Sequence, residues 1–219
     1  MDQEIIIQNT IDFVKETLKN AEGGHDWFHI ERVYKNALLI SKKEHVDLFI
    51  VRLGALLHDI ADAKFYDGDE TMGPKMATEF LTTQQVDADI RAHIVNIIHH
   101  ISYKNSLSST GEKFTSKELE VVQDADRLDA IGAIGIARCF NYGGFKNRTL
   151  YNPEILPNLK MTKEEYKKSE APTINHFYEK LLLLKDQMNT HTGKEIALER
   201  HRYMEQFLKQ FYEEWDGKK

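Results

Sequence analysis

The sequence predicts an all-α protein, folded as one compact bundle of roughly eight helices. Apolar residues recur three or four positions apart in one segment after another of the 219 residues, which is the period of a helix. No stretch of useful length alternates apolar and polar residues as a half-buried strand would. Residues that commonly begin helices precede several of the periodic segments. The boundaries of these segments therefore also indicate helices.

Three helices are expected at about residues 3–20, 26–45 and 47–62. The first two are amphipathic, and His29 borders the apolar face of the second, four positions before Val33. The third is apolar nearly all round, which is typical of a central, buried helix.

Two more helices are expected after a turn signal at residues 67–69. Pro74 suits the first turn of one of them. Asp87 is a plausible N-cap for the next, which extends to Ile101. The polar, serine-rich residues 105–111 are expected to form a loop.

A capping box at residues 115–118 is expected to open one helix that continues to about Phe140. Gly132 and Gly135 lower the helix propensity of this segment, and a close helix crossing would explain both.

The remaining chain is expected to hold a long loop or lid at residues 141–172, followed by two C-terminal helices within residues 173–215 that pack on it. The second of these helices is expected to start at a capping box at residues 192–195. No linker composition marks a boundary, so residues 1–219 are expected to form a single domain.

The composition excludes several classes of protein. The net charge of −6 argues against a general nucleic-acid binder, so no polymeric nucleic acid is expected as a partner. The single cysteine, Cys139, cannot form an internal disulfide, and no signal peptide is recognisable, which fits the cytoplasm. No apolar run is long enough to cross a bilayer.

Four residues with metal-ligand side chains lie on or at the ends of expected helices, next to apolar residues that should face inward: His29, His58, Asp59 and Asp126. Burying an ionised aspartate is costly unless it is paired or bound to a metal. The simplest explanation is that three helices bring these groups to one divalent cation, for which imidazole and carboxylate are common ligands.

The order of these residues resembles the HD superfamily of metal-dependent phosphohydrolases, in particular the small bacterial YedJ/YpgQ-type HD proteins. The similarity is carried by GHDWFHIERV at residues 24–33, LLHDIAD at 56–62, QDADRLDAIG at 123–132 and NHFYEKLL at 175–182. The chain would accordingly be one HD domain.

The resemblance implies an enzyme that holds one divalent ion through His29, His58, Asp59 and Asp126 and hydrolyses a phosphate ester or anhydride. Related proteins act on nucleoside triphosphates as pyrophosphohydrolases, so a small phosphate substrate such as a nucleotide is expected. Manganese or magnesium is favoured as the ion, and iron, nickel or zinc would also suit these ligands.

Three further residues are candidates for the reaction. Asp62 would position the attacking water or accept its proton, or it would only orient a ligand imidazole through a hydrogen bond. Lys64 is a candidate for phosphate binding, with a solvated side chain as the alternative. Arg127 would contact phosphate, or it would brace Asp129 or Glu31.

Several alternatives remain open at this point. Asp26 either orients His29 or only caps its helix. A second metal near His93, His99 and His100 is a minority hypothesis, because no carboxylate at comparable spacing joins them. The competing functions are a phosphomonoesterase, a cyclic-nucleotide phosphodiesterase and a nucleotide-binding regulator without turnover, and a homodimer is possible.

Overall fold

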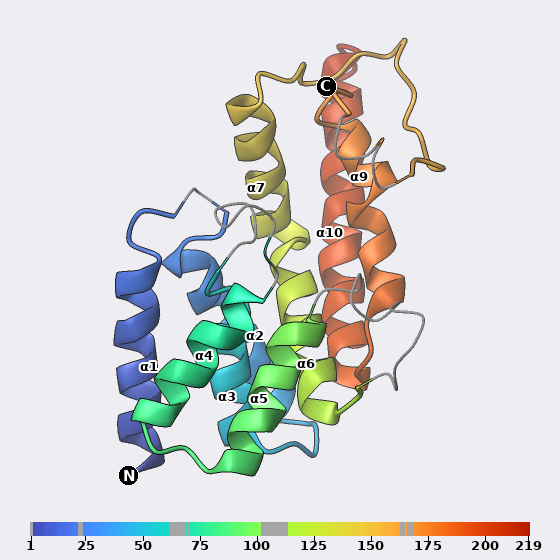
Figure 1. Cartoon of the computed structure of the whole chain (residues 1–219). Coiled ribbons are helices and arrows are strands. Elements are labelled where there is room, and N and C mark those ends of the chain that lie inside the picture. Colours follow the sequence, from blue (N-terminus) through green and yellow to red (C-terminus); the bar gives the residue numbers. More distant parts are fainter. Residues whose placement is uncertain are drawn as a thin grey trace. The chain divides into compact units, whose positions relative to one another are not determined.

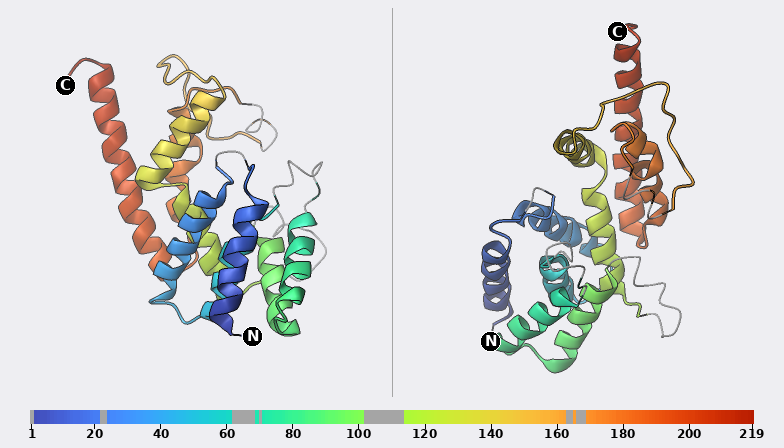
Figure 2. Two further views of the ribbon diagram at one scale, coloured as in Figure 1. Left: turned by 90° about the vertical axis from the view of Figure 1, so that its left-hand side faces the viewer. Right: turned by 45° about the horizontal axis from the view of Figure 1, so that its top comes forward.

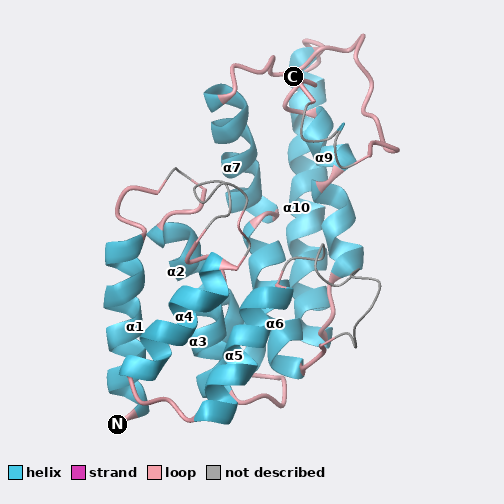
Figure 3. Ribbon diagram, in the orientation of Figure 1, coloured by secondary structure: helices cyan, strands magenta, loops and turns pink. Residues whose placement is uncertain are grey.

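The structure is a computed structural model that describes residues 2–21, 24–61, 69, 71–101, 114–162, 165 and 169–219. These residues form nine α-helices and one 3-10 helix, and none of them lies in a strand (Figure 3). The all-α prediction is confirmed. Chain contacts divide the protein into two compact units, Met1–Asp126 and Arg127–Lys219. The single domain expected over residues 1–219 stays a prediction.

The first unit is built around α3 (Leu48–Leu57), as its apolar sequence predicts (Figure 1). Eight of its ten residues are buried. It packs against α1 (Gln3–Thr17), α2 (Trp27–Ser41) and α5 (Ala88–His100). The helix α4 (Met72–Thr83) runs beside α5, which the two further views also show (Figure 2).

A glycine in the middle of α3 allows its neighbours to approach closely. A Cβ atom on Gly54 would lie 3.3 Å from Cγ2 of Ile97 on α5 and 3.4 Å from Cγ2 of Val122 on α6 (Lys117–Asp129). A larger residue would push these helices apart. This close packing fixes α3 against the helix that carries Asp126.

Aspartate side chains cap four helices of this unit. Each accepts a hydrogen bond from a backbone N–H group in the first turn, which satisfies a donor that has no partner within the helix. The caps are Asp2 on α1, Asp26 on α2, Asp47 on α3 and Asp87 on α5.

Two of the expected helices are shorter than their sequences suggest. The helix expected to reach residue 45 ends at Ser41, and α3 ends at Leu57 rather than at residue 62. His58 is the C-cap of α3, and its imidazole Nδ1 is 2.9 Å from the Ala55 carbonyl oxygen. The side chain thus satisfies one of the carbonyl groups that a helix leaves without a partner at its C-terminus. The loop expected at residues 105–111 lies outside the described residues.

The single helix expected from residue 115 to about Phe140 is in fact two helices, α6 and α7 (Gly132–Phe145). Gly132 has a φ of +75°, a left-handed conformation that glycine adopts without steric cost and that interrupts the helix. Its Cβ position is also 3.0 Å from the Arg200 side chain, so the close helix contact predicted from this glycine is present. The cap of α6 is Ser116, whose Oγ accepts a hydrogen bond from the Leu119 N–H group at 3.0 Å.

The second unit contains α7, α9 (Asn175–Glu179), the 3-10 helix η3 (Leu181–Gln187) and α10 (His191–Trp215), with α10 packed against α7 and η3. The loop expected at residues 141–172 is shorter, because α7 continues through its first five residues to Phe145. The first C-terminal helix is broken at Lys180, where φ is −145° and ψ is −57°.

The last helix begins two residues earlier than its capping box suggests. Its cap is Thr190, which accepts a hydrogen bond from the Gly193 N–H group at 2.9 Å, and it ends at Trp215 as expected. Among the helices that the structure describes, none is long and apolar enough to span a membrane.

Candidate metal centre

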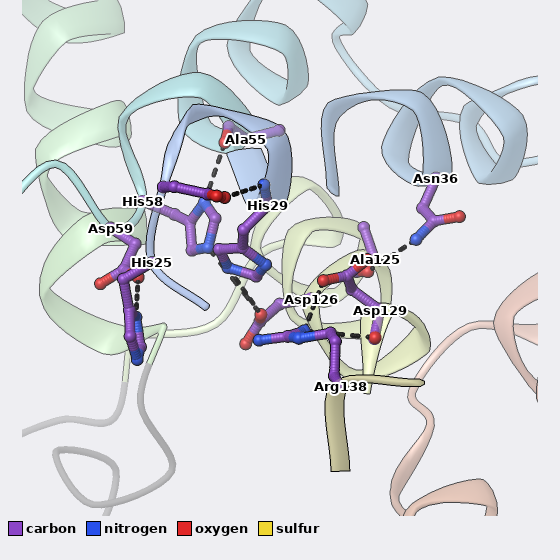
Figure 4. A network of polar contacts seen from close by, with 11 residues as sticks. His25, His29, Asn36, Ala55, His58, Asp59, Ala125, Asp126, Asp129 and Arg138 are labelled. Carbon is purple, nitrogen blue, oxygen red and sulfur yellow. Dashed lines mark hydrogen bonds and ion pairs between the residues drawn. The ribbon is translucent and has the colours of Figure 1, made fainter. Parts of the chain in front are cut away.

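Three of the four predicted ligands meet in the first unit. His29 lies in the first turn of α2, His58 caps the end of α3, and Asp126 lies in the last turns of α6 (Figure 4). One ligand atom from each residue lies within 4.8 Å of the other two. The Asp126 Oδ1 atom is 3.6 Å from His29 Nε2 and 3.9 Å from His58 Nε2. This spacing leaves room for a cation among the three atoms.

The hydrogen bond of His58 defines which ring nitrogen can bind a cation. Because the Ala55 carbonyl oxygen only accepts, the neutral imidazole donates through Nδ1 and keeps a lone pair on Nε2. That Nε2 atom is buried, and no hydrogen-bond partner for it exists in the described structure. A buried polar atom without a partner is costly, and a cation at this point would remove the cost. The site therefore fits a divalent metal ion.

The position of His29 depends on the start of α2. Its side chain is only 3 % exposed, and its ring meets the ring of His58 edge to face, with centroids 5.4 Å apart. The Asp26 carboxylate accepts a hydrogen bond from the His29 N–H group at 2.9 Å. The expectation that Asp26 caps this helix is confirmed, and the cap holds the backbone of His29 itself.

A residue that the sequence analysis missed connects α2 to the Asp126 turn of α6. The side-chain amide of Asn36, which is 8 % exposed, donates a hydrogen bond to the Ala125 carbonyl oxygen at 3.2 Å. Asn36 follows His29 by two helical turns, so the two share a face. A polar residue within the apolar face of α2 was the available signal in the sequence.

The fourth predicted ligand, Asp59, lies beside the group but is not a member of it. Its Oδ2 atom accepts a hydrogen bond from His25 Nδ1 at 2.6 Å. Burial acts to raise the pKa of Asp59, but the hydrogen bond from His25 and the electrostatic influence of the nearby rings of His58, His25 and His29 outweigh it, so the pKa lies below its usual value. Asp59 is therefore an ionised carboxylate, and its role as a ligand stays a prediction.

Of the other predicted site residues, Arg127 is half-buried and directly follows Asp126 in α6. Asp62 and Lys64 lie outside the described residues. Their roles in the reaction stay predictions.

The histidines considered for a second ion have other contacts. The Nε2 atom of His93 is 2.9 Å from Ser116 Oγ and 3.4 Å from Glu118 Oε2, and the rings of His99 and His100 lie edge to face. Within the described part of the chain, the only group of three suitable side chains is His29, His58 and Asp126. The described residues thus offer no second metal group at these histidines.

Known proteins are similar to this chain in sequence and in fold. The HD domain family matches residues 27–131, a range that contains all four predicted ligands. The YpgQ protein of Bacillus subtilis is 38% identical over 207 residues, which are 94% of this chain and 91% of YpgQ.

Crystal structures extend the comparison over nearly the whole chain. An HD-superfamily hydrolase from Bacillus thuringiensis is 43% identical, covers 98% of this chain and 99% of its own, and superposes with a TM-score of 0.79. The structure of B. subtilis YpgQ in complex with ADP is 35% identical in its superposition, with a TM-score of 0.77 over 98% of this chain and 97% of YpgQ.

Proposed function

The chain belongs to the HD-domain superfamily of metal-dependent phosphohydrolases, and from this premise we propose that its substrate is a nucleotide. We propose that it hydrolyses a phosphoanhydride or phosphoester bond, most simply by releasing pyrophosphate from a nucleoside triphosphate. The nucleotide part is supported by the ADP complex of the related YpgQ protein. The metal-dependent part is supported by the buried lone pair of His58 Nε2, which faces His29 and Asp126.

We assign four residues to a single divalent ion: His29, His58, Asp59 and Asp126. Two neutral imidazoles and two carboxylates leave the bound ion with a net charge near zero, and positions remain for water and a phosphate oxygen. Manganese or magnesium is the proposed ion. When bound, such an ion neutralises phosphate charge and activates water for attack at phosphorus.

The proposed roles of the remaining residues follow from their chemistry. Asp62 would accept a proton from the attacking water or hold it in line with the phosphorus atom. Lys64 and Arg127 would bind phosphate oxygens, and the planar guanidinium of Arg127 can do so through two hydrogen bonds.

The test is a product assay on purified protein. The metal-free protein would be incubated with a panel of ribo- and deoxynucleoside triphosphates, monophosphates and cyclic nucleotides, with manganese or magnesium added. Pyrophosphate with a nucleoside monophosphate is the expected product pair. Orthophosphate alone would indicate a phosphomonoesterase, and a ring-opened monophosphate would indicate a cyclic-nucleotide phosphodiesterase. Saturable nucleotide binding without any product would contradict the proposal and favour a regulator.

A matched variant tests whether the measured activity comes from this protein or from a contaminating enzyme. His58→Gln keeps a polar side chain of similar size but lacks the imidazole lone pair at the Nε2 position. It is expected to lose both bound manganese and product formation. Retention of product formation at the wild-type level would show that the activity does not depend on this group, and retention of bound manganese would show that His58 is not a ligand.

A further inference from the structure

The hydrogen bond between His25 and Asp59 joins two residues that are far apart in sequence at the edge of the metal group (Figure 4). We propose that His25 is a positioning residue, which holds the Asp59 carboxylate so that its other oxygen can bind the metal ion. This inference rests on the proposed metal site. His25 itself would not bind the ion or touch the substrate.

The chain just before α2 is shaped so that His25 reaches Asp59. Gly24 has a φ of +121°, a conformation that side-chain-bearing residues rarely adopt. Asp26 is fixed from the other side, because its carboxylate accepts a hydrogen bond from the His29 N–H group. His25 therefore lies between a turn and a helix cap. The centroid of its ring is 6.1 Å from the centroid of the His29 ring. The local sequence thus gives His25 a defined direction.

Asp59 needs such a partner because of where it lies in the chain. It follows the last residue of α3 and the C-cap, so the regular helix no longer orients it. Its neighbour His58 is oriented by the Ala55 carbonyl oxygen at 2.9 Å. His25, at 2.6 Å, does the same for Asp59. Two adjacent candidate ligands therefore each have a separate hydrogen-bond partner that fixes the side chain.

The chemistry of the pair suits a metal ligand. A carboxylate has two oxygen atoms, so one can accept a hydrogen bond from an imidazole while the other binds a cation. Partners that orient a ligand in this way commonly alter metal affinity by roughly 10–100-fold when they are removed. Because the His25 and Asp59 side chains are 39% and 22% exposed, the pair itself adds little to folding stability. Loss of His25 should therefore affect metal binding far more than folding.

The experiment is a calorimetric titration of the metal-free protein with Mn²⁺, which needs no substrate and no activity. His25→Ala is expected to weaken manganese binding by about tenfold. His25→Asn is expected to restore most of this loss, because its amide nitrogen can donate from nearly the same place as Nδ1. In an Asp59→Asn background, His25→Ala is expected to add little further loss, because its effect acts through the carboxylate.

A control variant uses a similar pair elsewhere. His191 and Glu195 on α10 lie 3.3 Å apart, and the His191 side chain is 84% exposed. His191→Ala should leave manganese affinity unchanged, and all these metal-free variants should melt within about 2 °C of the wild-type protein.

The outcomes separate this inference from the proposed function. If the wild-type protein binds no Mn²⁺, the proposed metal site itself is wrong, and this inference falls with it. If the wild-type protein binds and His25→Ala binds equally well, only the inference is wrong. It is also overturned if His25→Asn binds as weakly as His25→Ala, or if the losses from His25→Ala and Asp59→Asn simply add.

Discussion

Two aspartates one turn apart in α6 have opposite surroundings. The Asp126 side chain is 43% exposed, and its Oδ1 atom lies 3.6 Å and 3.9 Å from ring nitrogens of His29 and His58. Asp129 is 1% exposed and is hydrogen-bonded to the guanidinium of Arg138. That guanidinium also donates to the Asp129 carbonyl oxygen at 3.2 Å. The same residue type thus faces imidazoles at one position and a permanent cation at the other.

The difference shows what distinguishes a candidate ligand from a structural ion pair. Arginine is charged at all relevant pH values, so the negative charge of Asp129 is already compensated within the protein. A neutral imidazole carries no charge, and its lone pair can bind a cation. The group around Asp126 therefore offers ligand atoms to a cation from outside, whereas the Asp129 carboxylate is hydrogen-bonded to a cation of the protein itself. Variants of the two residues should accordingly give opposite results.

The largest effect is expected from Asp126→Asn. This change keeps the shape of the side chain but removes a charge and an acceptor from the proposed metal group. Hydrolysis should fall by more than the roughly 10–100-fold loss that follows removal of a residue that only orients a ligand. The stability of the metal-free protein should change by less than about 1 kcal/mol, because the side chain is partly exposed. The measurements are nucleotide turnover with manganese and denaturant unfolding without metal.

Asp126→Asn would break the comparison if it unfolded the metal-free protein as strongly as a core substitution does. Asp126 would then be a structural residue, and its proximity to two histidines would have no functional meaning.

Asp129→Asn should give the reverse pattern. The change leaves the Arg138 guanidinium without its carboxylate partner next to a buried amide. Breaking a fully buried pair costs about 3–5 kcal/mol, and the 30% exposure of the Arg138 side chain reduces the expected loss to about 2–3 kcal/mol. Manganese affinity of the folded protein should be unchanged. Urea unfolding and a manganese titration at low temperature would measure the two quantities.

A matched change on the other side of the pair serves as the control. Arg138→Met removes the cation that is hydrogen-bonded to the buried Asp129 carboxylate, so its destabilisation should be at least as large as that of Asp129→Asn. If either change lowered the manganese affinity of the folded protein, the two aspartates would not have separate roles.

The sequence predicted the helical class and the three chain segments that form the metal group, because both depend on local patterns. The periodicity of apolar residues indicates helices. The segments around His29, His58 and Asp126 resemble sequence motifs of a known superfamily. The sequence alone could not distinguish the surroundings of Asp126 from those of Asp129. Tertiary packing determines which side chain, such as Arg138, lies beside each aspartate.

The errors in the helix boundaries have specific physical causes. One helix was predicted over residues 115–140, but Gly132 adopts a positive φ. This conformation ends one helix, and the next helix starts there. The helix α3 was predicted to extend to residue 62, but it ends earlier. The His58 side chain forms a hydrogen bond with the Ala55 carbonyl oxygen and so caps the C-terminus of the helix. His25 and Asn36 were missed as supports of the site for a related reason: their partners, Asp59 and Ala125, are distant in sequence.

Asn36→Ala tests whether α2 and the Asp126 turn are held together as the comparison requires. Loss of this buried hydrogen bond should lower the free energy of unfolding by about 1–2 kcal/mol. It should also weaken manganese binding severalfold, because His29 and Asp126 are on the two joined helices. Asn141→Ala, at an exposed position of α7, should change neither quantity. A stability loss with unchanged manganese affinity would show that the bond supports the fold but not the site.

The smallest effect is expected from two helix caps that hold different backbone groups. Asp26 caps α2 through the N–H group of His29 itself, and Asp87 caps α5 through the N–H groups of Asp89 and Ile90. Replacing either aspartate by alanine should cost about 1 kcal/mol of stability, as is usual for an N-cap. Only Asp26→Ala should also weaken manganese binding, because only that cap fixes a proposed ligand. Equal manganese affinities in the two variants would mean that packing around the buried His29 ring, and not the cap, sets the position of this ligand.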